Sequence, residues 1–230
     1  MPQSQGHTDR AFEQDLHTLR QKLLAMGGTV EERLAQAVRA ITERDEALAR
    51  HVESHDAEID RLELEIDELC RRILALRQPA ASDLRLITTA LKIVTDLERC
   101  GDLAVNIAER ARDLASAPEM PPPPDLQRLA TLAQQQMSRA LDAFVAGSDE
   151  QAAEVLSGDE LLDALYLKIF NELLGLMMED TRYIRRATCL MSIAKHLERV
   201  GDHAMNVAEM IIYMVRGTDV RHSYKRTGQG

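Results

Sequence analysis

Residues 96–109 read DLERCGDLAVNIAE, and the same phrase returns at 196–209 as HLERVGDHAMNVAE. Nine of the 14 positions are identical, whereas two unrelated acidic helices would share about one or two. The chain therefore carries an internal duplication, with a spacing of 100 residues at this phrase. Farther upstream, the acidic residues at 56 and 60 recur at 159 and 163, so the spacing there is 103.

The residues around the two phrases predict helices throughout. Ala, Leu, Glu and Arg dominate, aromatic residues make up only 3% of the chain and Trp is absent. This composition favours helices over strands. Apolar residues recurring every three or four positions predict three long helices in each half. Their expected ranges are 9–44, 46–76 and 83–114, then 125–146, 149–179 and 182–216.

A run of prolines separates the two halves. Residues 117–125 read APEMPPPPD, and four consecutive prolines form a short extended spacer rather than a helix. Short loops between long helices predict antiparallel neighbours. We therefore expect an all-α fold of two tandem, internally duplicated three-helix bundles. The expected domains are a first bundle (1–117), a proline-rich linker (118–124), a second bundle (125–216) and a flexible tail (217–230).

The composition also argues against several classes of partner. The net charge of −10 disfavours nonspecific binding to nucleic acid or anionic lipid. The three cysteines share no metal-type spacing and lie in apolar helical patterns, which predicts buried thiols in a reducing cytosol. The N-terminal residues lack the apolar core of a signal peptide. The longest apolar run, MIIYMV at 210–215, is too short to span a bilayer. We expect a cytoplasmic protein.

The repeated phrase places acidic and amide side chains on one side of a helix. Glu98, Asp102, Asn106 and Glu109 are spaced by four, four and three residues, so they share one helical face. Two carboxylates four residues apart can clamp a cation between them. Oxygen ligands suit Mg²⁺, Mn²⁺ or iron, and Zn²⁺ is a further candidate although it usually recruits His or Cys as well. The phrase therefore predicts a divalent or ferric metal ion.

The duplication separates informative acidic pairs from accidental ones. Six acidic-x-x-x-Asp pairs occur, where random placement predicts roughly three. Glu63/Asp67 and Glu109/Asp113 have no counterpart in the other half. The remaining four pairs form two matched sets, and they supply the expected metal ligands: Asp56, Asp60, Glu98, Asp102, Asp159, Asp163, Glu198 and Asp202. The alternative is that these carboxylates form structural salt bridges with neighbours such as Arg99 and Arg199.

The phrase also carries a repeated glycine, Gly101 and Gly201. A glycine inside a helix costs about 1 kcal/mol relative to Ala, so its repetition predicts a close helix–helix contact. In the first helix, Gly27–Gly28 is expected to bend the helix or to admit a neighbouring backbone.

The two copies of the phrase differ at a few positions. Asp96 is replaced by His196 and Leu103 by His203, and the two metal sites are expected to diverge there. Together with Cys100, Leu103 is expected to make the first site slightly less polar than the second. A His on a helix is more often a surface or hydrogen-bonded residue than a ligand. The chain contains no Glu-x-x-His, which argues against a ferritin-like di-iron oxidase.

The two phrases, together with ALRQPAASDLRLITTALKIVTDLERCGD at 75–102, closely resemble the PhoU family, and the resemblance extends over about 9–216. It implies two three-helix bundles in tandem and a homodimer. It further implies a cytoplasmic negative regulator of the phosphate-starvation response and of phosphate uptake. Such a protein links the nucleotide-binding subunit of the phosphate ABC transporter to a sensor histidine kinase.

The resemblance also implies metal binding by the duplicated acidic motifs, on the eight residues given above, and it extends to Asp96, Asn106 and Asn206. A metal-dependent phosphohydrolase is the alternative, in which the carboxylate clusters would activate water. Against that alternative, the sequence offers no additional His or Lys beside both clusters to act as a base. A purely structural bundle would leave the matched carboxylates unexplained. We therefore expect a regulatory adaptor without catalytic residues.

Overall fold

A computed structural model of the chain describes residues 3–54, 57–115 and 122–218, with side chains from residue 10 onward. These ranges contain helices and no strand, so the all-α prediction is confirmed. Asp56, most of the predicted linker (118–121) and most of the predicted tail (219–230) lie outside the described residues. The elements are α1 (Gln3–Glu43), α2 (Glu46–Ser54), α3 (Ala57–Leu76), α4 (Ala81–Ala115), α5 (Pro124–Ala146), α6 (Asp149–Leu156), α7 (Asp159–Glu179), the 3₁₀ turn η1 (Thr181–Tyr183) and α8 (Ile184–Arg216).

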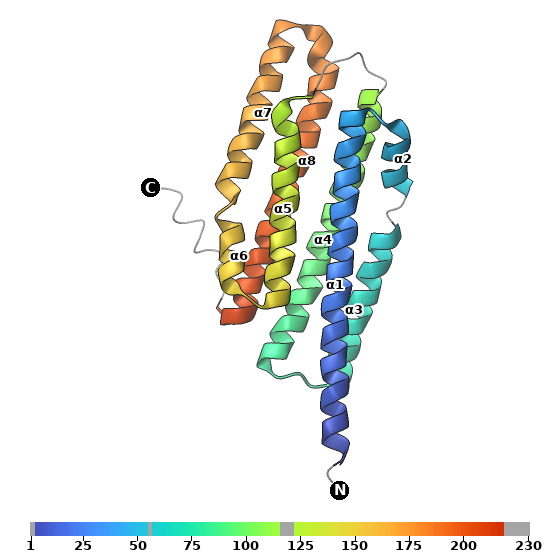
Figure 1. Ribbon diagram of the computed structural model, residues 1–230, viewed down its shortest axis with the longest axis vertical. Helices are drawn as coiled ribbons and strands as arrows, with labels where there is room; N and C mark the ends of the chain where they lie inside the picture. Colours follow the sequence, from blue (N-terminus) through green and yellow to red (C-terminus); the bar gives the residue numbers. More distant parts are fainter. Residues whose placement is uncertain (1–2, 55–56, 116–121, 219–230) are drawn as a thin grey trace.

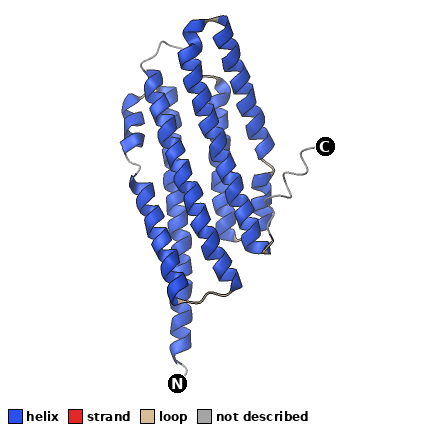
Figure 2. Ribbon diagram, turned by 180° about the vertical axis from the view of Figure 1, so that it is seen from behind, coloured by secondary structure: helices blue, strands red, loops and turns tan. Residues whose placement is uncertain are grey.

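The four helices α1–α4 of the first half are repeated as α5–α8 in the second. Figure 1 shows α1 beside α5, with α4 and α8 behind them and α3 and α7 on the two flanks. Figure 2 shows the same bundle from behind. Each half keeps the predicted three-helix layout: a first helix, an interrupted middle helix and a last helix that carries the repeated phrase.

The middle helix of each half is broken, whereas the sequence predicted one continuous helix at 46–76 and another at 149–179. Ser54 ends α2 and Ser157 follows α6, and these serines are 103 residues apart. The Ser54 hydroxyl donates to the His51 carbonyl at 3.1 Å, and the Ser157 hydroxyl donates to the Glu154 carbonyl at 2.7 Å. Such bonds from a side chain to the backbone compete with helix continuation.

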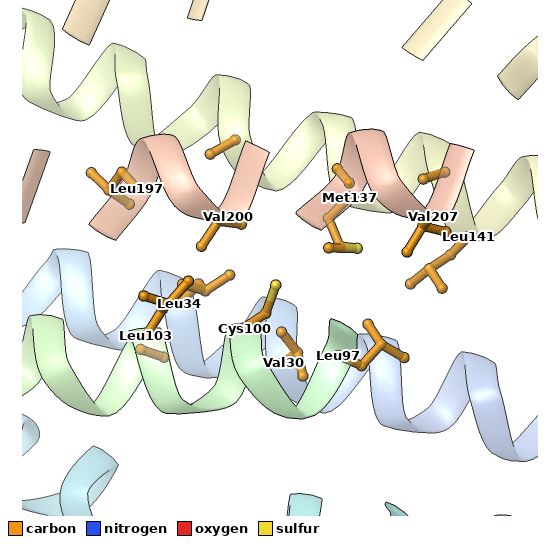
Figure 3. Packing of buried hydrophobic residues seen from close by; sticks show 14 of the residues in the cluster. Val30, Leu34, Leu97, Cys100, Leu103, Met137, Leu141, Leu197, Val200 and Val207 are labelled. Atoms are coloured by element: carbon orange, nitrogen blue, oxygen red, sulfur yellow. The ribbon is translucent and has the colours of Figure 1, made fainter. Parts of the chain in front are cut away.

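The halves share one hydrophobic core rather than two separate ones. Buried apolar residues from both halves form a single cluster, and α4 packs along α8 of the other half as extensively as along α1 of its own half. Figure 3 shows α4 side chains Leu97 and Leu103 opposite α8 side chains Val207 and Leu197. The two copies of the repeated phrase therefore run antiparallel across the centre of the molecule.

The repeated glycines allow a close approach, as predicted, and the approaching group is a side chain. A Cβ atom added to Gly101 would lie 2.8 Å from Cδ1 of Ile59 on α3. A Cβ atom added to Gly201 would lie 2.7 Å from Cδ1 of Leu162 on α7. Ile59 and Leu162 occupy equivalent positions in the two halves, so the duplication preserves this contact. The other glycine pair leaves α1 unbroken, since that helix continues through Gly27.

The structure places the three cysteines and the apolar runs within the helices. Cys70 and Cys100 are buried, whereas Cys189 is only half-buried. Burial raises the pKa of the Cys70 thiol to about 12, so this thiol stays protonated and acts as a small apolar side chain. Within the described ranges, no helix has a stretch long and apolar enough to cross a membrane.

Candidate metal-binding faces

The first half carries a group of four carboxylates, here called the first acidic face: Glu98 and Asp102 on α4 with Asp60 and Glu63 on α3. The pKa of Glu98 is raised, first by desolvation and then by the charges of Asp102, Glu63 and Asp60, with Arg99 acting in the opposite direction. The structure therefore brings three predicted residues together and adds Glu63. The fourth predicted residue, Asp56, lies outside the described residues.

The second half carries the equivalent second acidic face: Glu198 and Asp202 on α8 with Asp159 and Asp163 on α7. The pKa of Asp202 is raised, first by desolvation and then by the charge of Glu198. Asp159 and Asp163 raise it further, and Lys195 opposes them. All four residues predicted for this half therefore lie near one another on two packed helices.

The raised pKa values show what the two faces can do chemically. Desolvation and then neighbouring like charges raise the pKa of one carboxylate on each face, Glu98 and Asp202, and a bound cation would relieve that repulsion. The donors are all carboxylate oxygens, which suit Mg²⁺, Mn²⁺ or ferric iron. In the part of the chain with defined side chains, however, no three His, Cys, Asp or Glu residues converge closely enough to hold one ion. Metal binding at these eight residues stays a prediction.

The salt-bridge alternative has a geometric basis in the first face. Arg99 Nε lies 3.4 Å from Glu98 Oε2, and Arg99 Nη1 lies 3.2 Å from Asp102 Oδ2. The Arg99 side chain is 58% exposed, and exposed ion pairs contribute only about 0–1 kcal/mol. Arg99 is therefore a weakly held counter-charge that a more strongly bound cation could replace.

The sequence reasoning missed two residues of the second face, Lys195 and Tyr166. Lys195 Nζ lies 2.7 Å from Glu198 Oε1 and 2.6 Å from Glu198 Oε2, and 5.3 Å from the centre of the Tyr166 ring. Desolvation works against the ammonium, but the hydrogen bond and the charge of Glu198 prevail and raise the pKa of Lys195. The equivalent first-half residues are Thr95 and Glu63. Alignment of the halves at spacings of 100 and 103 residues would have revealed both differences.

The residues that differ between the two phrases do not lie on the acidic faces. Asp96 Oδ1 lies 2.7 Å from Nδ1 of His203, and the Asn206 side chain donates to the same oxygen at 3.5 Å. These contacts join α4 to α8, and Asp96 is about 200° around α4 from Glu98. The expectation that these positions would distinguish two metal sites is therefore corrected. They lie instead at the two edges of the interface between α4 and α8, and Asp96 and His203 meet at one of these edges.

Cys100 and Leu103 were expected to make the first metal site less polar, and this is also corrected. Both side chains are buried, at 0% and 4% exposure, and Figure 3 shows them in the apolar contact between α4 and α8. The two acidic faces instead differ in polarity because Thr95 and Glu63 of the first half correspond to Lys195 and Tyr166 of the second half.

We expect Asp96→Ala to lower the free energy of unfolding by about 1–2 kcal/mol, because it leaves a half-buried His203 without its acceptor. Each side chain of the pair is only 16% exposed. Urea denaturation followed by far-UV circular dichroism measures the change. Asp102→Ala is the matched control on the same helix, since that carboxylate is 42% exposed and is crowded by like charge. Equal losses in both variants would contradict a structural role for the Asp96–His203 contact.

These observations define a class of protein, a duplicated helical bundle with one shared core and an acidic face in each half. The PhoU domain matches residues 23–111 and 126–211, and the chain belongs to the PhoU family.

Similar proteins match almost the whole chain. The phosphate-specific transport system accessory protein PhoU homolog of Pseudomonas aeruginosa is 44% identical over 217 residues, which cover 94% of this chain and 90% of the relative. The homolog of Rhizobium meliloti is 42% identical over 215 residues, covering 93% and 91%. The crystal structure of PhoU from Pseudomonas aeruginosa superposes with a TM-score of 0.85 at 42% identity, covering 90% of this chain and 100% of that one. For the phosphate transport system regulatory protein PhoU from Streptococcus pneumoniae, the TM-score is 0.84 at 29% identity, covering 91% and 99%.

Proposed function

We propose that this chain is an accessory protein of a phosphate-specific transport system and a cytoplasmic negative regulator of the phosphate-starvation response and of phosphate uptake. In this role it is a metal-binding adaptor and a homodimer. It connects the nucleotide-binding subunit of the phosphate ABC transporter to a sensor histidine kinase. The observation that carries the proposal is the nearly full-length similarity to relatives named as phosphate transport accessory proteins.

An adaptor needs a surface for its partners, and α7 offers one. Its outward side chains Leu167, Leu174 and Met178 are 57%, 42% and 82% exposed. The equivalent positions on α3, 103 residues earlier, are Leu64, Arg71 and Ala75. Exposed apolar side chains grouped on one helix are typical of a protein interface, and this difference between the halves supports a docking role for the second one.

The adaptor works by differential binding. A partner that contacts one conformation of the bundle better than another shifts the equilibrium between the two conformations. The state of the transporter then determines which docking surface the bundle presents to its partners. Metal ions on the acidic faces hold α3 against α4 and α7 against α8 by neutralising crowded carboxylates. The names of the relatives are those of a transport accessory protein, which favours binding over catalysis.

Deletion of the gene tests the regulatory role. With phosphate in excess, we expect the deletion strain to express a reporter of the phosphate-starvation response, because the kinase is no longer restrained. Expression of the intact chain should restore repression. A reporter that stays silent in the deletion strain would contradict negative regulation.

Matched variants test whether the acidic faces take part in this regulation. We expect the combined variant Glu98→Gln, Asp102→Asn, Glu198→Gln and Asp202→Asn to fold but to restore repression poorly. The control is Glu109→Gln with Asp113→Asn, a pair with the same spacing on α4 and no counterpart in the other half. Equal repression by both variants would contradict the involvement of the acidic faces in regulation.

A further inference from the structure

The helix α7 has a second apolar side besides the one that it buries. Its inner side packs into the bundle through the buried residues Leu162, Leu165, Ile169 and Leu173. Its outer side carries five exposed residues at successive spacings of three, four, three and four, here called the outer stripe: Ala164, Leu167, Asn171, Leu174 and Met178. This is the spacing of the a and d positions in a coiled coil, where one helix packs along another.

The residue types of the outer stripe fit a pair of identical helices. Leu167 and Leu174 fall at the d positions, and Asn171 falls at the central a position. A single Asn at an a position fixes the register and the two-stranded state of a coiled coil. Its amide both donates and accepts hydrogen bonds, so two copies of Asn171 that face each other across a two-fold axis satisfy one another.

The charges beside the outer stripe favour a parallel pair. Asp163 and Lys168 are five residues apart, at the g and e positions that meet between parallel helices. Asp163 of one copy therefore lies opposite Lys168 of the other, on both sides of the axis. The Lys168 side chain is 65% exposed and its present partner is Asp125 on α5, a surface contact that contributes little. An antiparallel pair would instead place Met178 against Ala164.

The equivalent helix of the first half lacks these features. Its residues at the five equivalent positions, 103 earlier, are Arg61, Leu64, Glu68, Arg71 and Ala75. Three of the five are charged, so no apolar stripe is formed. Asp60 and Glu65 stand where Asp163 and Lys168 stand in α7, and two like charges at these positions repel. The outer stripe is therefore particular to the second half.

We propose that two copies of this chain pair in parallel through the outer stripe of α7, across a two-fold axis that passes beside Asn171. This inference rests on the proposed homodimer and names its surface and its orientation. The stripe covers only two heptads, but the bundle already holds α7 as a helix, so pairing does not require the helix to form first. The occupant that the charges and the central Asn favour is a second copy.

Sedimentation equilibrium of the full chain tests the surface. The wild type is expected to be a dimer. In the variant Leu167→Lys with Leu174→Lys, the dissociation constant of the dimer is expected to rise by about 100-fold or more, because charged groups replace the central apolar contacts. The control is Leu64→Lys with Leu76→Lys on α3, where the side chains are 65% and 70% exposed, and this variant should stay dimeric. Circular dichroism establishes that each variant is folded.

Disulfide cross-linking tests the orientation. Met178→Cys, made in a Cys189→Ala background, is expected to form a disulfide between two copies on oxidation, because equivalent a positions face each other in a parallel pair. Ala75→Cys, at the equivalent position on α3, is the control and should stay reduced. In an antiparallel pair, two Met178 positions would lie about 40 Å apart and no link would form.

The outcomes separate the inference from the proposed function. A dimer that survives Leu167→Lys with Leu174→Lys overturns the inference and leaves the homodimer in place. Loss of the dimer in that variant without cross-linking of Met178→Cys overturns the parallel orientation. A monomeric wild type overturns the homodimer and the inference together, and assigns the outer stripe to a different protein.

Discussion

Val200→Asp is expected to lower the free energy of unfolding by about 4 kcal/mol or more and to unfold both halves together. Val200 is fully buried, and Figure 3 places it in the contact between α8 and α4, close to Cys100. A carboxylate there loses its hydration without gaining a partner, which costs several kcal/mol. Domains of this size are commonly stable by only about 5–15 kcal/mol, so this one substitution removes a large share of the total.

The loss is expected to reach the first half because the buried cluster is continuous across both. Hydrogen exchange measured on peptides from α1 and α4 should show lost protection alongside peptides from α5 and α8. The matched control is Val215→Asp on the same helix, where the side chain is 37% exposed and the cost is expected to stay below about 1 kcal/mol. Protection that persists in α1 and α4 of the Val200→Asp variant would show that the first half is stable on its own.

The all-α fold and the internal duplication could be predicted because each leaves a pattern that can be read directly in the sequence. The apolar spacing located the long helices, and the repeated phrase located the equivalent positions. The break in each middle helix could not be predicted from apolar spacing, which continues through it. Its signal was a serine at equivalent positions, Ser54 and Ser157, whose hydroxyls bond to carbonyls of the preceding turn.

The packing of one half against the other was beyond the sequence pattern. An apolar stripe shows that a helix buries one side, but it does not specify which helix covers it. For this reason Asp96 and His203 were expected to mark where the two metal sites diverge, although the antiparallel pairing of α4 with α8 brings them together at 2.7 Å. Seven of the eight predicted carboxylates lie on the acidic faces because they share a helix or neighbouring helices, and metal binding there stays a prediction. Lys195 could not be predicted from the residues that the two copies share, because its first-half equivalent is Thr95.

Gly27→Ala and Gly28→Ala, adjacent substitutions in one helix, are expected to change stability in opposite directions. The sequence suggested that this pair bends the helix or admits a backbone, but α1 is continuous and the group admitted at Gly27 is a side chain. A Cβ atom on Gly27 would lie 2.2 Å from Cδ1 of Leu141 on α5. Apart from its chain neighbours and the nearby backbone of α1, no heavy atom of the described residues lies within 4 Å of a Cβ atom on Gly28, so Ala there should stabilise the helix by about 0.5–1 kcal/mol.

At Gly27 the same gain in helix propensity is offset by overpacking. Leu141 is buried at 4% exposure, so its displaced methyl group must move other core side chains, at a cost of about 1–3 kcal/mol. Gly27→Ala is therefore expected to be less stable than Gly28→Ala by about 1–3 kcal/mol in urea denaturation. Combining Gly27→Ala with Leu141→Ala should make the two changes strongly non-additive, because the smaller side chain removes the clash. Additive losses would instead mean that Leu141 rotates away without cost and that α1 and α5 are held together by other contacts.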